Sequence, residues 1–249
     1  MNHRQKQNIL HSACLLAMAA LLSTASIQGA WAQTAPSLGT ASNFAVLGGA
    51  GVTCTASGVA GNVGSLLSVT GFPPPAPALC TLVGTVHAGD AAAITAFNDF
   101  VLAYAALAAI PCPTDAPHLL SGDLVGKVLS PGVYCISGVG LLTGQLTLNG
   151  PSNGIWIFKA ATSLTPIGGS VVMAGGGQKR NVYWQTGTAV SLDNTQFLGN
   201  ILAGSAITFT GVGSSLVGRA LAKTAVTMTG ANISLGSKGG VPGNPGGNK

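Results

Sequence analysis

Side chains that carry acid–base or nucleophilic chemistry are few in this sequence. All five of its acidic residues are aspartates, and two of them, Asp90 and Asp99, belong to one predicted helix. Hydrolysis of glycosidic bonds normally needs a pair of carboxylates, and neither such a pair nor a G-x-S-x-G motif is evident. The glycines at 175–177 precede Gln178-Lys179-Arg180 and lack the Gly-Lys-Ser/Thr ending of a phosphate-binding loop. We therefore expect no enzymatic activity and no bound cofactor.

The amino terminus predicts export. Residues 1–32 combine a positively charged start, an apolar core over 14–22 and the cleavage motif Ala30-Trp31-Ala32, as signal peptides do. The apolar core is too short to cross a bilayer, and we expect no membrane span in the mature chain. A retained anchor helix is the alternative. We expect a secreted, extracellular protein, with the periplasm or the cell surface as other destinations.

Four cysteines remain after cleavage, namely Cys54, Cys80, Cys112 and Cys135. An even number of cysteines in an oxidising compartment favours disulfides. Three pairings are possible, and we favour Cys54–Cys80 with Cys112–Cys135, because each bond would tie down one irregular stretch bracketed by strands. A metal site is the alternative, but no pair has C-x-x-C spacing, and His87 and His118 stand alone. We expect no bound metal.

The charge distribution argues against nucleic acid as a partner. The formal net charge is +5, and the basic residues are scattered, without a run that would grip phosphates. The mature length fits a single domain, residues 33–235, which we expect to be a monomer. The glycine-rich tail, 236–249, has almost no apolar residues and is expected to be disordered.

The carboxyl-terminal half repeats one phrase three times. It occurs as Ala189-Val190-Ser191-Leu192, Ala206-Ile207-Thr208-Phe209 and Ala225-Val226-Thr227-Met228. Small or hydroxyl residues alternate with large apolar ones, which is the pattern of a strand with one buried face. The phrases recur at roughly 17–19 residues, a period typical of solenoids, in which stacked units share one core. The repeats predict a β-helix.

One helix is predicted over residues 90–110. Asp90 is its candidate N-cap, and Pro111 and Pro113 follow its end. Ile94, Phe97, Val101, Tyr104 and Leu107 are expected to form its apolar face. We expect the helix to lie along the solenoid and cover one side of it. Binding of a partner protein through this face is the alternative.

Several motifs, in order, make the chain similar to a known family. They are Phe44-Ala45-Val46-Leu47, Leu129-Ser130-Pro131-Gly132-Val133-Tyr134, Leu142-Thr143-Gly144-Gln145-Leu146-Thr147-Leu148, Ile155-Trp156-Ile157-Phe158, Asn181-Val182-Tyr183-Trp184-Gln185 and Gly218-Arg219-Ala220-Leu221-Ala222. Together they resemble the ice-binding-like proteins, an antifreeze family of bacteria, fungi and algae, from about Leu38 to Ile233. The resemblance implies a mainly β fold: a right-handed, discontinuous parallel β-helix with one long helix alongside and a capping insertion, here about 52–79. It also implies adsorption to ice, with inhibition of ice growth and recrystallisation.

Outward residues of the repeats form the candidate ice-contacting surface. The large apolar residues should point inward, which leaves hydroxyl and alanine positions outside. Threonine is stiff at χ1, so a row of threonines holds its hydroxyls and methyls in fixed positions, where they can order water in a repeating pattern. The candidates are Ala189, Ser191, Ala206, Thr208, Thr210, Ala225, Thr227 and Thr229, with Thr147 and Thr165 extending the row upstream and Asp193 as its one discordant member.

Two questions stay open at this level. Threonine is also a favoured residue of any exposed strand, and rows containing Tyr183 and Gln185, or Thr195, Ser214 and Ser234, are alternatives for the flat face. A surface adhesin or matrix protein that uses the same solenoid without ice activity is the second candidate function. Trp156 and Trp184, which a sugar-binding surface would expose for stacking, are expected to lie in the core.

Overall fold

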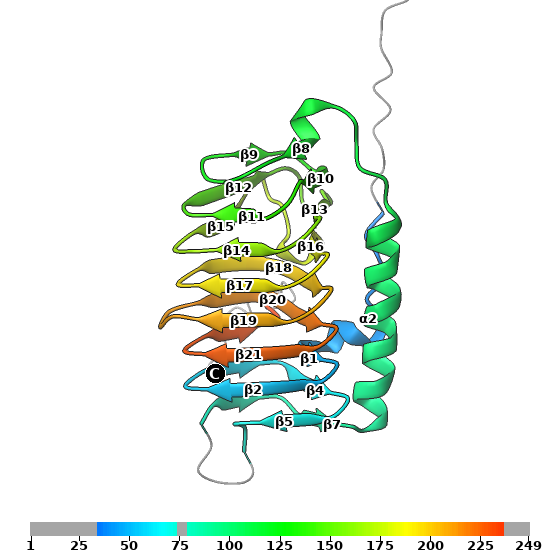
Figure 1. Cartoon of the computed structure of the whole chain (residues 1–249), viewed down its shortest axis with the longest axis vertical. Coiled ribbons are helices and arrows are strands. Elements are labelled where there is room, and N and C mark those ends of the chain that lie inside the picture. The colour runs from blue at the N-terminus through cyan, green and yellow to red at the C-terminus, as the bar shows by residue number, and fades with distance from the viewer. Residues whose placement is uncertain (1–33, 74–78, 237–249) are drawn as a thin grey trace, which may run out of the picture. The chain divides into compact units, whose positions relative to one another are not determined.

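The computed structural model describes residues 34–73 and 79–236, within the unit Gln33–Lys249. The predicted signal peptide, the tail beyond residue 236 and part of the predicted cap lie outside the described residues. Figure 1 shows a stack of parallel strands with one helix beside it. The chain forms the β-helix predicted by its repeats, in the discontinuous parallel form implied by the family resemblance, with three faces.

A seven-stranded parallel sheet makes the first face. Period-2 alternation dictates its strands, since residues 226 and 228 of the last repeat are fully buried, whereas 227 and 229 are exposed. In stacking order the strands are β11 (Gly140–Leu142), β14 (Leu164–Pro166), β17 (Val190–Asp193), β19 (Ile207–Thr210), β21 (Ala225–Thr229), β2 (Gly51–Thr55) and β5 (Ser68–Thr70).

The other two faces share a fifteen-stranded sheet. The helix-covered face consists of β8 (Leu119–Leu120), β10 (Gly132–Ile136), β13 (Trp156–Ala160), β16 (Val182–Thr186), β18 (Gln196–Ala203), β20 (Ser215–Ala222), β1 (Phe44–Gly48), β4 (Asn62–Ser65) and β7 (Val86–Ala88). The third face consists of β9 (Val128–Leu129), β12 (Gln145–Asn149), β15 (Ser170–Ala174), the first residues of β18 and β20, β22 (Asn232–Ser234), β3 (Gly58–Ala60) and β6 (Thr81–Val83).

The strands β18 and β20 each turn a corner between two faces at a glycine. Gly199 and Gly218 pair with each other there, at φ of 104° and 157°. A Cβ on Gly218 would lie 1.8 Å from the carbonyl oxygen of Gly199. Only glycine lets the coils stack this closely at the corner.

The stacking order differs from the chain order. The first strands pair with the last ones, β1 with β20, β2 with β21 and β3 with β22. Figure 1 shows these blue and red strands side by side. The expected capping insertion over 52–79 is therefore corrected, because β2 to β5 within that range are themselves coils of the solenoid. They form one end of it because β5, β6 and β7 each have a strand partner on one side only among the described residues.

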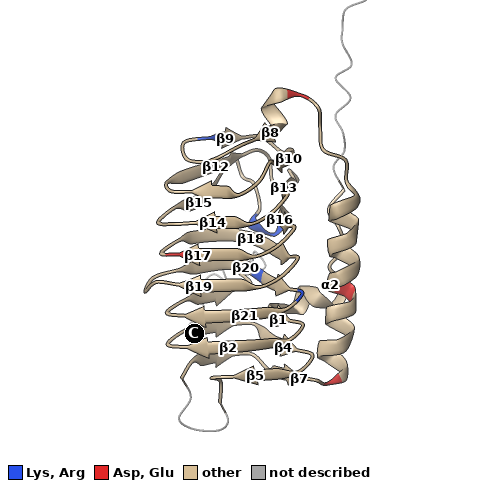
Figure 2. Cartoon of the chain, viewed as in Figure 1, with Lys and Arg blue, Asp and Glu red and all other residues tan. Residues whose placement is uncertain are grey.

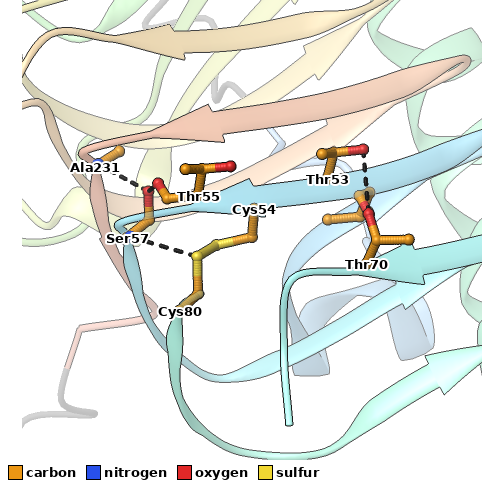
Figure 3. Close-up of a disulfide and its surroundings, with 8 residues drawn as sticks. Thr53, Cys54, Thr55, Ser57, Thr70, Cys80 and Ala231 are labelled. Carbon is orange, nitrogen blue, oxygen red and sulfur yellow. Dashed lines mark hydrogen bonds between the residues drawn. A yellow bond between two sulfur atoms is a disulfide. The ribbon is translucent and has the colours of Figure 1, made fainter. Parts of the chain in front are cut away.

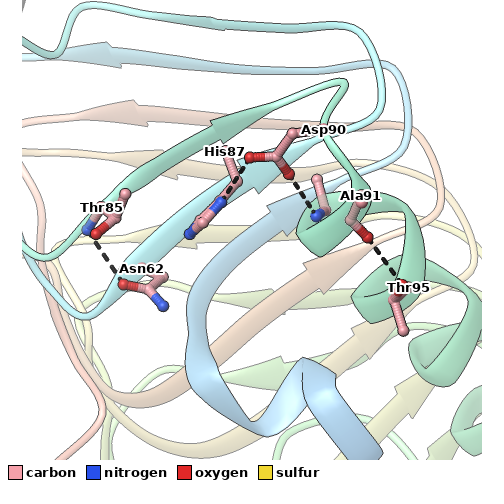
Figure 4. A network of polar contacts seen from close by, with 7 residues as sticks. Asn62, Thr85, His87, Asp90, Ala91 and Thr95 are labelled. Atoms are coloured by element: carbon pink, nitrogen blue, oxygen red, sulfur yellow. Dashed lines mark hydrogen bonds and ion pairs between the residues drawn. The ribbon is translucent and has the colours of Figure 1, made fainter.

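Helix α2 (Ala91–Ala109) carries the chain back to the far end of the stack, where β8 begins. Its 19 residues span about 28 Å, and residues 110–118 complete the crossing. The Asp90 side chain caps the helix by accepting from the amide of Ala93 at 2.8 Å. Figure 4 shows this cap with His87, whose Nδ1 lies 2.7 Å from Asp90 Oδ2.

The predicted apolar face of α2 is confirmed in part, because Leu107 is buried and Phe97, Val101 and Tyr104 are partly buried against the core, whereas Ile94 is 46% exposed. The fully buried side also includes residues that the prediction left out, three of them small: Ala93, Ala96, Phe100 and Ala103. Alanines let the helix axis approach the sheet closely, so packing favours them over larger neighbours. By length and composition α2 is apolar enough to cross a membrane, but here it packs on Phe44, Leu47, Ile157, Tyr183, Leu202 and Leu221.

The interior of the solenoid contains a column of aromatic rings. Phe158 stacks between Tyr134 and Trp184, with ring centroids 5.3 Å and 3.9 Å apart, because the three residues occupy matching positions on β10, β13 and β16. The indole of Trp184 donates to the carbonyl oxygen of Leu198 at 2.9 Å. Trp156 is fully buried as well. Both tryptophans lie in the core, as predicted.

Both favoured disulfides are present, which confirms the pairing. Cys54 is bonded to Cys80 and Cys112 to Cys135, at Cα separations of 6.1 Å and 5.8 Å. The first bond closes the end coil that contains β3, β4 and β5. The second ties the segment after α2 to β10.

Candidate functional site

The seven-stranded sheet presents an exposed surface that we call the threonine face, defined as the outward residues of its seven strands. Strand register places these residues in rows across the stack. The central row is Leu141, Thr165, Ser191, Thr208, Thr227, Thr53 and Thr70. A second row holds Ile167, Asp193, Thr210, Thr229 and Thr55, and a third row holds Ala189, Ala206, Ala225, Gly51 and Ser68.

Alternation along β17, β19 and β21 follows the prediction. Val190, Leu192, Ile207, Phe209, Val226 and Met228 are all at most 1% exposed. The small and hydroxyl residues between them point outward, and Thr210, Thr227 and Thr229 are exposed. The fold thus brings nine of the ten predicted site residues onto one surface, namely Thr165, Ala189, Ser191, Ala206, Thr208, Thr210, Ala225, Thr227 and Thr229.

Thr147 does not extend the row, which corrects that prediction. It belongs to β12, and its partners there are Val172 of β15 and Val128 of β9. These strands form the third face, because the coil turns a corner between β11 and β12. On the threonine face the upstream positions are taken by Leu141 and Ile167 instead.

Sequence reasoning missed three threonines of this surface. Thr53 pairs with Thr227 and with Thr70, and Thr55 pairs with Thr229. A signal was present, because Val52-Thr53-Cys54-Thr55 has the same pattern as Val226-Thr227-Met228-Thr229. The two segments are distant in the chain, and only the stacking of β2 on β21 makes them neighbours. The most regular part of the surface is therefore a block of four strands, β19, β21, β2 and β5.

The repeat of this block has two dimensions. Neighbouring parallel strands lie about 4.7–4.9 Å apart, and outward residues along one strand lie about 6.6 Å apart. Each threonine keeps its methyl and hydroxyl in one orientation because Cβ branching restricts χ1. The block therefore offers a grid in which hydroxyls and methyls recur at regular intervals.

The hydroxyls of the block make few bonds within the protein. Thr70 Oγ1 lies 3.4 Å from Thr53 Oγ1, and Thr210 Oγ1 lies 3.4 Å from the carbonyl oxygen of Leu192. Within 34–73 and 79–236, no side-chain hydrogen bond is donated by Thr208, Thr227 or Thr229. These hydroxyls are free to bond water at the surface.

Charge is nearly absent from the threonine face. Asp193 is the single charged residue in its seven strands, and Figure 2 shows the acidic colour on β17 alone among them. Lysines and arginines lie on other parts of the described chain; Lys159, for example, bonds the last carbonyl oxygens of α2, including that of Ala108 at 2.9 Å. Apart from Asp193, a ligand at the threonine face therefore meets uncharged side chains, mostly hydroxyl and methyl groups.

Four of the five residues named for the alternative rows are buried, and the fifth, Ser234, is half-buried on β22 of the third face. Tyr183 and Gln185 lie on the helix-covered face and are 5% and 7% exposed. Thr195 and Ser214 are fully buried, with hydroxyls that donate to the carbonyl oxygens of Asp193 and Thr210. These residues hold the corner of the coil together. A row must be exposed to contact a ligand, and the central row of the threonine face meets this condition at Thr227 and Thr53, whereas the rows with Tyr183 and Gln185 or with Thr195 and Ser214 do not.

The aspartates other than Asp193 hold local structure. Asp99 of α2 accepts from the amide and hydroxyl of Thr40, at 2.7 Å and 2.6 Å. Asp123 accepts from Thr143, and Asp115 contacts His118. Across the described ranges, no group of three or more His, Cys, Asp or Glu residues is placed to hold a metal ion. The groups that carry acid–base chemistry are thus dispersed and already bonded.

Comparisons with known proteins agree on one family. The model of the family described as ice-binding-like matches residues 46–234. An ice-binding protein of Nostoc sp. (strain HG1) is 40% identical over 179 residues, covering 70% of this chain and 64% of the relative. An ice-binding protein of Flavobacterium frigoris (strain PS1) is 34% identical over 187 residues, covering 68% and 66%. The matches thus span just under two thirds of these two relatives.

Solved structures agree with the sequence comparisons. The ice-binding protein of the Antarctic ascomycete Antarctomyces psychrotrophicus has a TM-score of 0.73 at 30% identity, over 82% of this chain and all of that one. An ice-binding protein from an Antarctic biological consortium has the same TM-score at 35% identity, over 81% and 91%. The architecture is therefore shared with structures that match over nearly their full length.

Proposed function

The chain belongs to the ice-binding-like family, and we propose that it is an exported ice-binding protein that adsorbs to ice through its threonine face. Adsorption at this surface would inhibit both the growth and the recrystallisation of ice. We propose further that it acts as a monomer in the extracellular space, without catalytic activity. The predicted signal peptide and the two disulfides support export.

The observation that carries the proposal is the regular block of threonines on β19, β21, β2 and β5. A grid of fixed hydroxyls can hold a layer of water whose repeat matches that of a crystal surface, and the methyls between them favour contact with ordered water cages. Water already immobilised in this way costs little further entropy when it joins ice. A charged group would instead keep its own hydration shell, and the block contains none.

An adhesin that binds polysaccharide gains no support from the described surface. Sugar binding commonly uses exposed aromatic rings, and both Trp156 and Trp184 are buried. Each of the compared relatives is described as ice-binding.

Thermal hysteresis and recrystallisation inhibition of purified residues 33–249 test the function directly. The first variant is Thr227→Tyr, which places a bulky ring at the centre of the block. We expect it to lose most of the activity, while the free energy of unfolding changes by at most about 0.5 kcal/mol, as is usual for an exposed site.

Thr147→Tyr is the matched control, since it makes the same substitution on a strand of the third face. It should keep full activity. If unsubstituted residues 33–249 do not shape ice, the proposed function is overturned. Full activity in Thr227→Tyr with loss in Thr147→Tyr would instead move the contact surface to the third face.

A further inference from the structure

One end of the threonine face rests on an edge strand. On this face β5 pairs with β2 alone, so the described chain offers no second neighbour for its backbone. Thr70 is the last threonine of the central row and lies on β5. Its hydroxyl approaches the carbonyl oxygen of Val52 and the hydroxyl of Thr53 only at 3.4 Å. Edge strands with few bonds open most readily, so this part of the grid needs another anchor.

That anchor starts at Gly71, directly after Thr70. The carbonyl oxygen of Gly71 accepts from the amides of Leu79 and Cys80, at 3.1 Å and 2.9 Å. Gly71 has φ of 90°, and a Cβ there would lie 2.0 Å from the carbonyl oxygen of Cys54. Only glycine fits between the two cysteine-bearing segments. The end of β5 is therefore held against the backbone around Cys80.

The disulfide fixes that backbone to β2, the strand next to the edge of the threonine face. Cys54 lies between Thr53 and Thr55 on β2, and its side chain points inward to Cys80. Figure 3 shows the sulfurs bridging the two strands below these threonines. The amide of Cys80 donates to the carbonyl oxygen of Gly71, which directly follows Thr70. The Cys54–Cys80 bond therefore links the threonines of β2 to Thr70 on the edge strand β5.

Ser57 extends the same network to β21. Its amide donates to Cys80 Sγ at 3.3 Å, and its hydroxyl donates to the carbonyl oxygen of Thr55 at 2.8 Å. The hydroxyl also accepts from the amide of Ala231, two residues beyond Thr229, at 3.0 Å. These contacts, visible in Figure 3, link the second row of threonines to the disulfide as well.

We propose that the Cys54–Cys80 disulfide, acting through Gly71 and Ser57, is a positioning element of the ice-binding surface that keeps Thr55 and Thr70 in register with Thr227 and Thr229. This role rests on the proposed function, since it adds the end coil to the working surface. The disulfide touches no ice itself. The Cys112–Cys135 bond ties β10, a strand of the helix-covered face, to the segment after α2, and Cys135 packs on the side that faces α2. It serves as the matched control.

The test is a double-mutant cycle on ice activity near 0 °C with residues 33–249. We expect Cys54→Ala/Cys80→Ala to lose most of the activity and Cys112→Ala/Cys135→Ala to keep it. In the parent, Thr70→Tyr should lower the activity. In the Cys54→Ala/Cys80→Ala background the same change should have little further effect, because Thr70 is already displaced, whereas Thr208→Tyr should remove what is left. Equal effects of Thr70→Tyr in both backgrounds would overturn the proposal.

Hydrogen exchange measures the positioning independently of ice. In Cys54→Ala/Cys80→Ala, exchange should accelerate at 68–70 and stay unchanged at 207–210. Unchanged exchange at 68–70 would contradict the positioning role even if the parent binds ice. An inactive parent with faster exchange there would overturn the function and leave the positioning intact.

Gly71→Ala is the second variant if the cysteine variant fails to fold, because it disturbs the same contact with the disulfide present. It should lower the ice activity, and adding Thr70→Tyr to Gly71→Ala should then have little further effect on that activity. Full activity in Gly71→Ala would count against the proposal.

Discussion

At the scale of single residues, Asp193 is the least suited member of the threonine face. Its partner on β19 is Thr210 and its neighbour on the other side is Ile167, so it marks the border between the regular block and the less regular coils. A carboxylate binds its own water strongly, and the orientation of that water follows the charge, in conflict with a repeating layer. The border should therefore limit the area that contacts ice.

Asp193→Thr should raise the thermal hysteresis measured at a fixed protein concentration. The change extends the second row to β17 and removes the only charge from the face. Ser191→Thr is the control that improves the central row without removing a charge, and it should have a smaller effect. Lower activity in Asp193→Thr, with the protein folded, would show that the carboxylate takes part in the contact.

At the scale of elements, the aromatic column holds three coils together. Trp184 is 1% exposed, stacks on Phe158, contacts Phe197 with ring centroids 4.8 Å apart and donates to Leu198. Trp184→Ala should reduce the free energy of unfolding by about 3–5 kcal/mol, because it leaves a cavity and an unpaired carbonyl oxygen. Leu102→Ala, on the exposed side of α2, should change it by less than about 0.5 kcal/mol. Chemical denaturation measures both; similar losses in the two variants would contradict the assigned packing.

The docking of α2 should depend on pH through its aspartates. Bonds from the hydroxyl and amide of Thr40 hold the pKa of Asp99 below its ordinary value of 3.8, and the amide of Ala93 together with His87 lowers the pKa of Asp90. A lowered folded-state pKa means that the ionised form stabilises the fold. That stabilisation is fully present above the unfolded-state pKa and is lost as the pH falls through the folded-state pKa.

The melting temperature should accordingly be steady as the pH falls towards about 4 and should drop below it. Asp99→Asn should show a lower melting temperature at neutral pH and a smaller drop in acid. Thr40→Val, which removes the hydroxyl donor, should likewise lower the melting temperature at neutral pH and reduce its drop in acid. An unchanged acid drop in Asp99→Asn would assign the pH dependence to other groups.

At the scale of the whole molecule, early and late strands of the described chain build the threonine face together, with β2 pairing β21. The junction is held by Arg219 of β20, whose guanidinium donates twice to the carbonyl oxygen of Ser42, at 3.0 Å and 2.6 Å, and once to Asn200 Oδ1 at 2.8 Å. Burial lowers the pKa of Arg219. Asn200 is fully buried and donates to the carbonyl oxygens of Arg180 and Val182. The amino-terminal coils thus depend on a polar network in the last coils.

Arg219→Ala should reduce the free energy of unfolding by about 1–3 kcal/mol, because it leaves Asn200 Oδ1 buried without a donor. Ice activity near 0 °C should fall to the extent that the first coils detach there, since Thr53, Thr55 and Thr70 leave with them. Arg180→Ala, at an exposed position, is the control and should alter neither quantity. A parent-like melting curve for Arg219→Ala would refute the junction role.

Local patterns were enough to predict much of this protein. Period-2 alternation identified the inward and outward residues of β17, β19 and β21, and a capping aspartate identified the start of α2. These two inferences succeeded because they depend on residues close in sequence, whose geometry follows from backbone periodicity. The discontinuous β-helix was instead implied by the resemblance to the ice-binding-like family. The cysteine pairing also succeeded, since each bond joins segments within one part of the chain.

Only the tertiary structure decided which strands are neighbours and which face stays bare. It placed Thr53 beside Thr227, Thr55 beside Thr229 and Thr70 beside Thr53. It also moved Thr147 around a corner and covered Tyr183 with a helix. Period-2 alternation predicts that a residue points outward. It does not predict to which of the three faces the strand of that residue belongs. That assignment comes from corners, from the crossing made by α2 and from stacking between coils far apart in sequence, and all three depend on contacts that no local pattern encodes.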